Sequence, residues 1–101
     1  MKQIHKYLKM KDTIGNLLSQ AGYNEVKSDT ETDVYGSVYC IYALGRKRFM
    51  IQWDSEEDFG SVEFWQSDNM WVTIEPIIVD ESEQNFNNGL SELCQVINAK
   101  L

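Results

Sequence analysis

The residues best placed to do chemistry are four acids in one short segment, Asp54, Glu56, Glu57 and Asp58. Carboxylates this close together can bind a divalent cation, but the segment lacks the Asp-x-Asn-x-Asx-Gly order and the terminal Glu of an EF-hand loop. An acidic, solvated loop is the better interpretation. We predict that these four carboxylates attract Lys and Arg side chains of a partner, and we expect neither a metal nor a cofactor.

Residue types that usually carry catalysis at neutral pH are scarce. The single histidine, His5, lies near the N-terminus beside Lys6, and Cys40 and Cys94 are far apart without a Cys-x-x-Cys motif. That spacing suggests neither a zinc site nor a disulfide framework, and it leaves a disulfide between the two cysteines open. The segment Gly45-Arg46-Lys47-Arg48 has the charge of a phosphate-binding patch, but a hairpin turn accounts for it without a ligand. We therefore expect a binding protein and not an enzyme.

Charge is segregated along the chain. Its 101 residues hold nine Lys and Arg against sixteen Asp and Glu, which gives a net charge of −7. Residues 1–11 carry four of the lysines, whereas residues 49–99 carry eleven acids and no basic residue. A field of one sign over such a stretch repels nucleic acid and anionic membranes and attracts basic partners. We expect a basic protein partner and no direct contact with nucleic acid or membrane.

Length and composition predict a single domain over residues 1–101. Globular domains commonly have about 100–150 residues, and 43% of these residues are hydrophobic. The apolar runs at residues 38–44 and 76–79 are far shorter than the roughly 20 residues of a membrane span, and residues 1–6 lack the apolar core of a signal peptide. We expect a cytoplasmic protein.

Apolar residues repeat with helical spacing at both ends of the chain. Near the N-terminus this spacing predicts a helix over residues 3–21 that ends at Gly22, or a shorter helix over 13–21 capped by Asp12. Near the C-terminus, Asp80-Glu81-Ser82-Glu83 has the form of a capping box. The apolar steps of three and four residues that follow it predict an amphipathic helix that packs on a sheet.

Between these helices, β-branched and aromatic residues become frequent and the apolar period shortens to two. This pattern predicts strands near residues 35–44, 47–53, 61–66 and 70–78, with residues 25–33 a loop or a weak edge strand. Short turns at Gly45-Arg46 and at residues 66–69 join the strands into hairpins. The expected fold class is α+β: a four-stranded antiparallel β-meander flanked by N- and C-terminal helices, in the order α-β-β-β-β-α.

Side-chain alternation divides the predicted sheet into two faces, because successive residues of a strand point to opposite sides. The core face holds Val38, Cys40, Tyr42, Phe49, Ile51, Trp53, Val62, Phe64, Val72 and Ile74. The second face holds Tyr39, Ile41, Ala43, Met50, Gln52, Glu63, Trp65, Trp71, Thr73 and Glu75, with Trp65 opposite Trp71 and Glu63 opposite Thr73. Trp65 and Trp71 are the candidate anchors of a protein interface. The alternatives are that the N-terminal helix covers the second face or that a homodimer buries it.

One resemblance bears on the kind of partner. The run from Asp54 to Asp58, the later acids Asp80, Glu81 and Glu83, and the exposed aromatic residues resemble, in type, the small acidic toxin-immunity proteins of bacteria. The resemblance implies a stoichiometric inhibitor that occludes the basic cleft of a cognate nuclease toxin, with carboxylates in positions meant for phosphates. The predicted partner-binding residues are Asp54, Glu56, Glu57, Asp58, Glu63, Trp65, Asp68 and Trp71.

A second resemblance covers more of the chain. The order Leu17-Leu18-x-x-Ala21-Gly22-Tyr23, then Phe49-x-Ile51-x-Trp53-Asp54 and a final Val96-Ile97-Asn98 is similar to type III secretion chaperone-like proteins, which are small, acidic and often dimeric. Their fuller pattern has an additional helix between strands, for which residues 54–60 leave little room. A third possibility, based on the same acids, is a phage-encoded DNA mimic that blocks a host defence nuclease.

Overall fold

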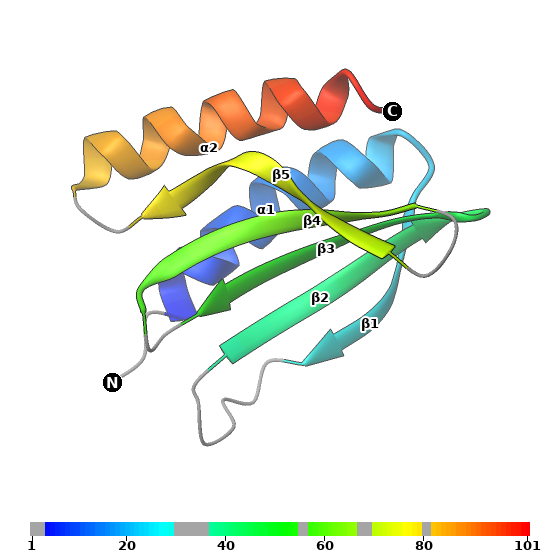
Figure 1. Cartoon of the computed structure of the whole chain (residues 1–101), viewed down its shortest axis with the longest axis horizontal. Helices are drawn as coiled ribbons and strands as arrows, with labels where there is room; N and C mark the ends of the chain where they lie inside the picture. Colours follow the sequence, from blue (N-terminus) through cyan, green and yellow to red (C-terminus); the bar gives the residue numbers. More distant parts are fainter. Residues whose placement is uncertain (1–3, 30–36, 55–56, 67–69, 80–81) are drawn as a thin grey trace.

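The computed structural model describes residues 4–29, 37–54, 57–66, 70–79 and 82–101. The chain forms two helices and five strands in the order α1 (Ile4–Gln20), β1 (Asn24–Asp29), β2 (Ser37–Leu44), β3 (Lys47–Asp54), β4 (Phe59–Gln66), β5 (Met70–Val79) and α2 (Glu83–Asn98). Each strand pairs antiparallel with the strand that follows it, so the sheet is a meander (Figure 1). The predicted α+β class with terminal helices is confirmed.

The prediction of four strands is wrong, because the sheet has five. The additional strand is β1, which lies among the residues predicted to be a loop or a weak edge strand. It pairs with β2 from Asn24–Ala43 to Asp29–Tyr39. Residues 24–28 are all exposed, so β1 carries none of the alternating apolar pattern by which a half-buried strand is recognised. Backbone pairing to β2, and not side-chain burial, defines this strand.

Helix α1 follows the longer of the two predicted helices, and the shorter alternative over 13–21 is wrong. Its buried residues, Tyr7, Met10, Ile14 and Leu18, are separated by three or four positions and form one stripe. The helix closes as predicted at Gly22, which has a φ of 100°. The backbone N–H of the next residue donates to the carbonyl oxygen of Leu18 at 2.9 Å, a bond typical of a Schellman C-terminus.

Helix α2 begins later than its predicted cap. Ser82 is the N-cap, and its hydroxyl accepts a hydrogen bond from the backbone N–H of Asn85 at 3.1 Å. The predicted cap, Asp80, lies outside the described residues. Glu83 therefore occupies the first turn, where the helix dipole favours a carboxylate.

Both helices pack on the same face of the sheet (Figure 1). Helix α1 lies over β2 and β3, α2 lies over β5, and the two helices contact each other. We call this side of the sheet the covered face. The predicted core residues occupy it: Val38, Cys40, Tyr42, Phe49, Ile51, Trp53, Val62 and Ile74 are buried, Phe64 packs at the margin, and Val72 stays 40% exposed.

Packing on the covered face is close at Gly60. A Cβ atom at this position would lie 2.5 Å from both the Sδ atom of Met10 and the Cε3 atom of Trp53. Trp53 is fully buried, and its ring meets Phe86 of α2 edge-on with 6.3 Å between ring centres. The missing side chain of Gly60 is therefore what lets α1, β3 and β4 approach closely.

Candidate functional site

The opposite side of the sheet, which we call the open face, is covered by neither helix (Figure 1). This excludes the alternative that the N-terminal helix covers it. Strand alternation assigns to it Lys27, Tyr39, Ile41, Ala43, Arg48, Met50, Gln52, Asp54, Glu63, Trp65, Trp71, Thr73 and Glu75. Isolated apolar residues are common on protein surfaces, whereas large contiguous apolar patches are a feature of interaction sites.

The aromatic centre of the open face is the pair Trp65 and Trp71. The two residues are directly opposite each other on β4 and β5, as predicted, and both rings remain partly exposed. Arg48 pairs with Trp65 across β3 and β4, and its guanidinium carbon lies 5.6 Å from the centre of the Trp65 ring. This cation–π contact stabilises the position of the Trp65 ring, which remains partly exposed.

A polar network occupies the middle of the open face. The side-chain amide nitrogen of Gln52 donates to the hydroxyl of Ser61 at 3.0 Å and to Oε2 of Glu63 at 3.1 Å. Glu63 pairs with Met50 on β3 and, as predicted, with Thr73 on β5. The hydrogen bond from Gln52 orients the Glu63 carboxylate on the sheet, and a carboxylate held in this way can accept hydrogen bonds from a cation.

The predicted acidic loop lies at one end of the open face. Oδ1 of Asp54 accepts a hydrogen bond from the backbone N–H of Glu57 at 3.1 Å. Asp58 follows with a φ of 58°, a left-handed conformation that Asp tolerates better than most side chains. Glu56 lies outside the described residues. We call Asp54, Glu57 and Asp58 the acidic end.

The structure does not bring the acidic end and the tryptophans together. Arg48, beside Trp65, and Asp54 are six residues apart on the extended strand β3, a separation of roughly 20 Å. Of the predicted site residues, Glu63, Trp65 and Trp71 share the open face, whereas Asp54, Glu57 and Asp58 lie at its far end. Asp68 lies outside the described residues.

A basic cluster flanks the tryptophans, and the sequence analysis did not connect it with them. Arg46, Lys47 and Arg48 lie at the β2–β3 turn, where Gly45 has a φ of 61° as the predicted two-residue turn requires. We call these three residues the basic end. The signal was present in the sequence, because a hairpin register that places Trp65 on β4 also places Arg48 beside it on β3.

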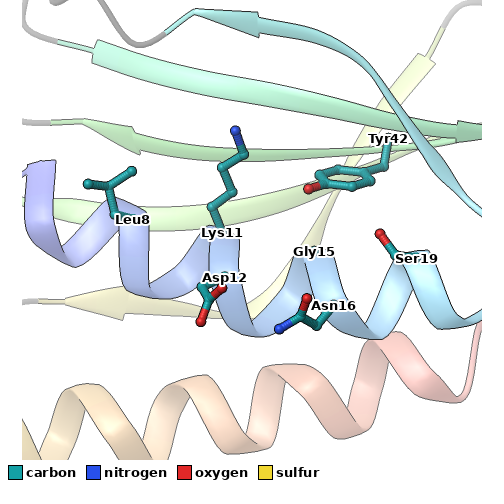
Figure 2. Close-up of a pocket in the computed structure, with 7 residues that line it drawn as sticks. All are labelled: Leu8, Lys11, Asp12, Gly15, Asn16, Ser19 and Tyr42. Atoms are coloured by element: carbon teal, nitrogen blue, oxygen red, sulfur yellow. The ribbon is translucent and has the colours of Figure 1, made fainter.

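A groove of about 450 Å³ opens between α1 and β2, on the covered side of the sheet (Figure 2). Its lining residues are Leu8, Lys11, Asp12, Gly15, Asn16, Ser19 and Tyr42. Figure 2 shows the Tyr42 ring reaching toward α1 at Gly15, where a Cβ atom would lie 2.5 Å from the Tyr42 hydroxyl oxygen. The ammonium of Lys11 is 2.7 Å from Oε2 of Glu25 and is therefore already paired.

The cysteines do not form a reactive centre. Both thiols are free, so the disulfide left open by the sequence does not form. Burial raises the pKa of the Cys40 thiol and that of Cys94, which disfavours the nucleophilic thiolate. Among the described residues, no group of three His, Cys, Asp or Glu side chains is arranged to hold a metal ion.

Within the described part of the chain, neither helix has the length and apolar content needed to cross a membrane. A scan against protein-family models, a search of curated proteins and a search of solved structures find no match to this chain.

Proposed function

We propose that this protein is a stoichiometric protein-binding inhibitor whose contact surface is the open face. The observation that carries the proposal is that both helices pack on one side of the sheet, so that Trp65 and Trp71 stay partly exposed on the other. Tryptophan and arginine are the residue types most enriched among interface hot spots, and Arg48 lies against Trp65. The proposed role requires binding only, and no catalytic group.

The charge of the molecule supports a basic partner. The chain carries a net charge of −7, and the acidic end adds a group of carboxylates roughly 20 Å from the tryptophans along the same face. Complementary charge accelerates encounter by roughly 10–10³-fold over uncharged surfaces. A nuclease toxin with a cleft for phosphates is a partner of this kind, and the corresponding role is that of an immunity protein.

The tryptophans and the acidic end affect different steps of binding. The tryptophans form the apolar contact that sets how long a complex lasts, since buried aromatic anchors act mainly on dissociation. The acidic end lies at the rim, where exposed charges act mainly on the rate of association.

The test uses the tagged protein and the basic protein that co-purifies with it, in a binding assay and in an assay of the partner's nuclease activity. Trp71→Ala should weaken binding by about 30-fold or more, the equivalent of about 2 kcal/mol. Leu8→Ala is the matched control, because Leu8 is an exposed apolar residue on α1. An unchanged affinity of the Trp71→Ala variant would remove the open face from the mechanism.

The acidic end is tested by its effect on kinetics. The variant Glu57→Lys should slow association at low salt, and the difference should shrink as salt screens the charges. Glu92→Lys on the exposed side of α2 provides a charge-reversal control. Asp58 is left unchanged in this test because Lys is strained at its left-handed φ. An association rate that is equal in all three proteins would exclude steering by this loop.

A further inference from the structure

We propose that, without a partner, two copies of this chain pack open face to open face about a two-fold axis that runs across the strands. The basic end of each copy then lies over the acidic end of the other. This inference concerns the free protein and holds whether or not the inhibitory role is correct.

The argument starts from the order of residues along the central strand. On the open face, β3 presents Arg48, Met50, Gln52 and Asp54 in sequence. Arg48 lies at the basic end, Asp54 lies at the acidic end, and the midpoint falls between Met50 and Gln52. Along β3, the open face is therefore charged with opposite signs at its two ends and apolar or uncharged between them, while Glu63 lies beside Met50 on β4.

Two simple symmetric arrangements bring the open faces of two copies together, and they differ in which charges they place in contact. A two-fold axis parallel to the strands stacks Arg48 on Arg48 and Asp54 on Asp54, so both ends repel. An axis across the strands reverses the strand direction, so that Arg48 of each copy faces Asp54 of the other. Sheets that pack face to face keep their strands within about 30° of alignment, which preserves these pairings. Only the second arrangement is self-complementary, as a two-fold dimer requires.

The apolar residues of the open face provide the contact between the two ends. Ile41 on β2 pairs with Met50 on β3, which in turn pairs with Glu63 on β4. Tyr39 on β2 lies opposite Gln52, and Trp65 on β4 lies opposite Arg48. All four apolar or aromatic side chains are partly exposed in the single chain. Arg48 has five N–H donors, and its cation–π contact with Trp65 uses its charge and not these donors, so it can also bind a carboxylate of the second copy.

The size of the face predicts a reversible dimer. Five strands about 4.8 Å apart and roughly 20 Å long give a footprint of roughly 400 Å² per copy. Stable interfaces bury about 800 Å² of accessible surface per partner, so this one falls among weak, exchangeable contacts. A tighter partner on the same face would displace the second copy, so dimerisation and partner binding would be mutually exclusive.

Sedimentation velocity on the purified protein, from about 1 to 500 µM and at low and high salt, tests the proposal. We expect a monomer–dimer equilibrium, and the effect of the charge reversal described next should become smaller at high salt, because salt screens exposed charges. Arg48→Asp should raise the dimer dissociation constant by about tenfold or more at low salt, because it replaces two attractions with two repulsions. The exchanged pair Arg48→Asp, Asp54→Arg should restore it to within about threefold. Lys100→Asp, on the helical side, makes the same change in net charge and should have little effect.

Each outcome decides the proposal. A wild-type protein that stays monomeric at the highest concentration overturns it. A dimer indifferent to Arg48→Asp overturns the axis, because the parallel arrangement merely exchanges one like-charge contact for another. Failure of the exchanged pair to restore association overturns the pairing of the two ends. Circular dichroism of each variant shows whether it is folded. Trp71→Ala leaves every charge in place and should also weaken the dimer, because it removes apolar contact from the open face.

Discussion

The two faces of this sheet are built from the same strands, on alternate residues, yet they have opposite properties. The covered face is closed by two helices around fully buried residues such as Trp53, whereas the open face presents two tryptophans that stay partly exposed. Burial on one face stabilises the monomer, and exposure on the other leaves apolar surface available for binding. The number of tryptophans therefore does not show how many belong to the core. The direction in which each side chain points from its strand places Trp53 in the core and Trp65 and Trp71 on the open face.

The largest expected difference between the faces is in the cost of losing a tryptophan. Trp53→Ala should lower the free energy of unfolding by about 3–5 kcal/mol, because it leaves a cavity between the sheet and both helices. Trp71→Ala should cost about 1 kcal/mol, the scale of a cross-strand pair on a partly exposed surface. Urea denaturation of both variants checks this. Equal losses would mean that the open face is a second core.

A smaller effect of either sign is expected at two glycines of the covered side. Gly60→Ala should destabilise the protein by about 1–3 kcal/mol, because the new methyl group meets Trp53 and Met10. Gly89→Ala is the matched control. Its Cβ would lie 3.5 Å from Ile78, an ordinary contact, and alanine favours the helix by up to about 1 kcal/mol. Thermal or urea unfolding should show shifts in opposite directions, and two shifts of the same sign would contradict the packing described.

The covered side should also respond to high pH. Burial, and next to it the neighbouring Cys40, raises the pKa of Tyr7 above its ordinary value of 10.0, and burial raises the pKa of Tyr23 and Tyr42. A raised folded-state pKa contributes stability that is complete below the unfolded pKa and is lost as pH rises beyond it. The free energy of unfolding should therefore fall above about pH 10, by up to about 1.4 kcal/mol per pH unit for each such group. Urea midpoints between pH 8 and 11 should fall less steeply in Tyr7→Phe, and parallel curves would show that Tyr7 is not involved.

The smallest effect is expected where the helical layer ends, at the ion pair between Lys11 of α1 and Glu25 of β1. The hydrogen bond to Glu25 raises the pKa of Lys11, but the two side chains are 23% and 34% exposed. Solvent screening limits such a pair to less than about 1 kcal/mol. A double-mutant cycle with Lys11→Ala and Glu25→Ala should give a small coupling that disappears in 1 M salt. A coupling above 2 kcal/mol would mean that this edge belongs to the core.

The parity of the strands could be predicted from the sequence because the turns are short. The two-residue turn after Leu44 fixes Phe49 opposite Tyr42, and the same reasoning set Trp65 opposite Trp71. Strand β1 was predicted only as one of two alternatives, a loop or a weak edge strand, since its exposed residues carry no burial pattern that decides between them. The sequence also could not predict which face of the sheet each helix covers, because an apolar stripe shows that a helix is packed against something and does not identify the surface. The separation of the acidic end from the tryptophans could have been predicted, since β4 starts opposite Asp54 and runs antiparallel to β3 until Trp65 lies opposite Arg48.

The order of elements along the chain has a consequence for synthesis. Helix α1 is made first of the described elements, but its apolar stripe is covered by β2 and β3, which follow it, and α2 is made last. Each strand needs only its predecessor for pairing, so hairpins can close as they are completed, in a topology whose local contacts favour rapid folding. Tyr7, Met10 and Ile14 therefore lack the strands that bury them until β3 has been made, and apolar side chains exposed during such an interval favour aggregation of a nascent chain.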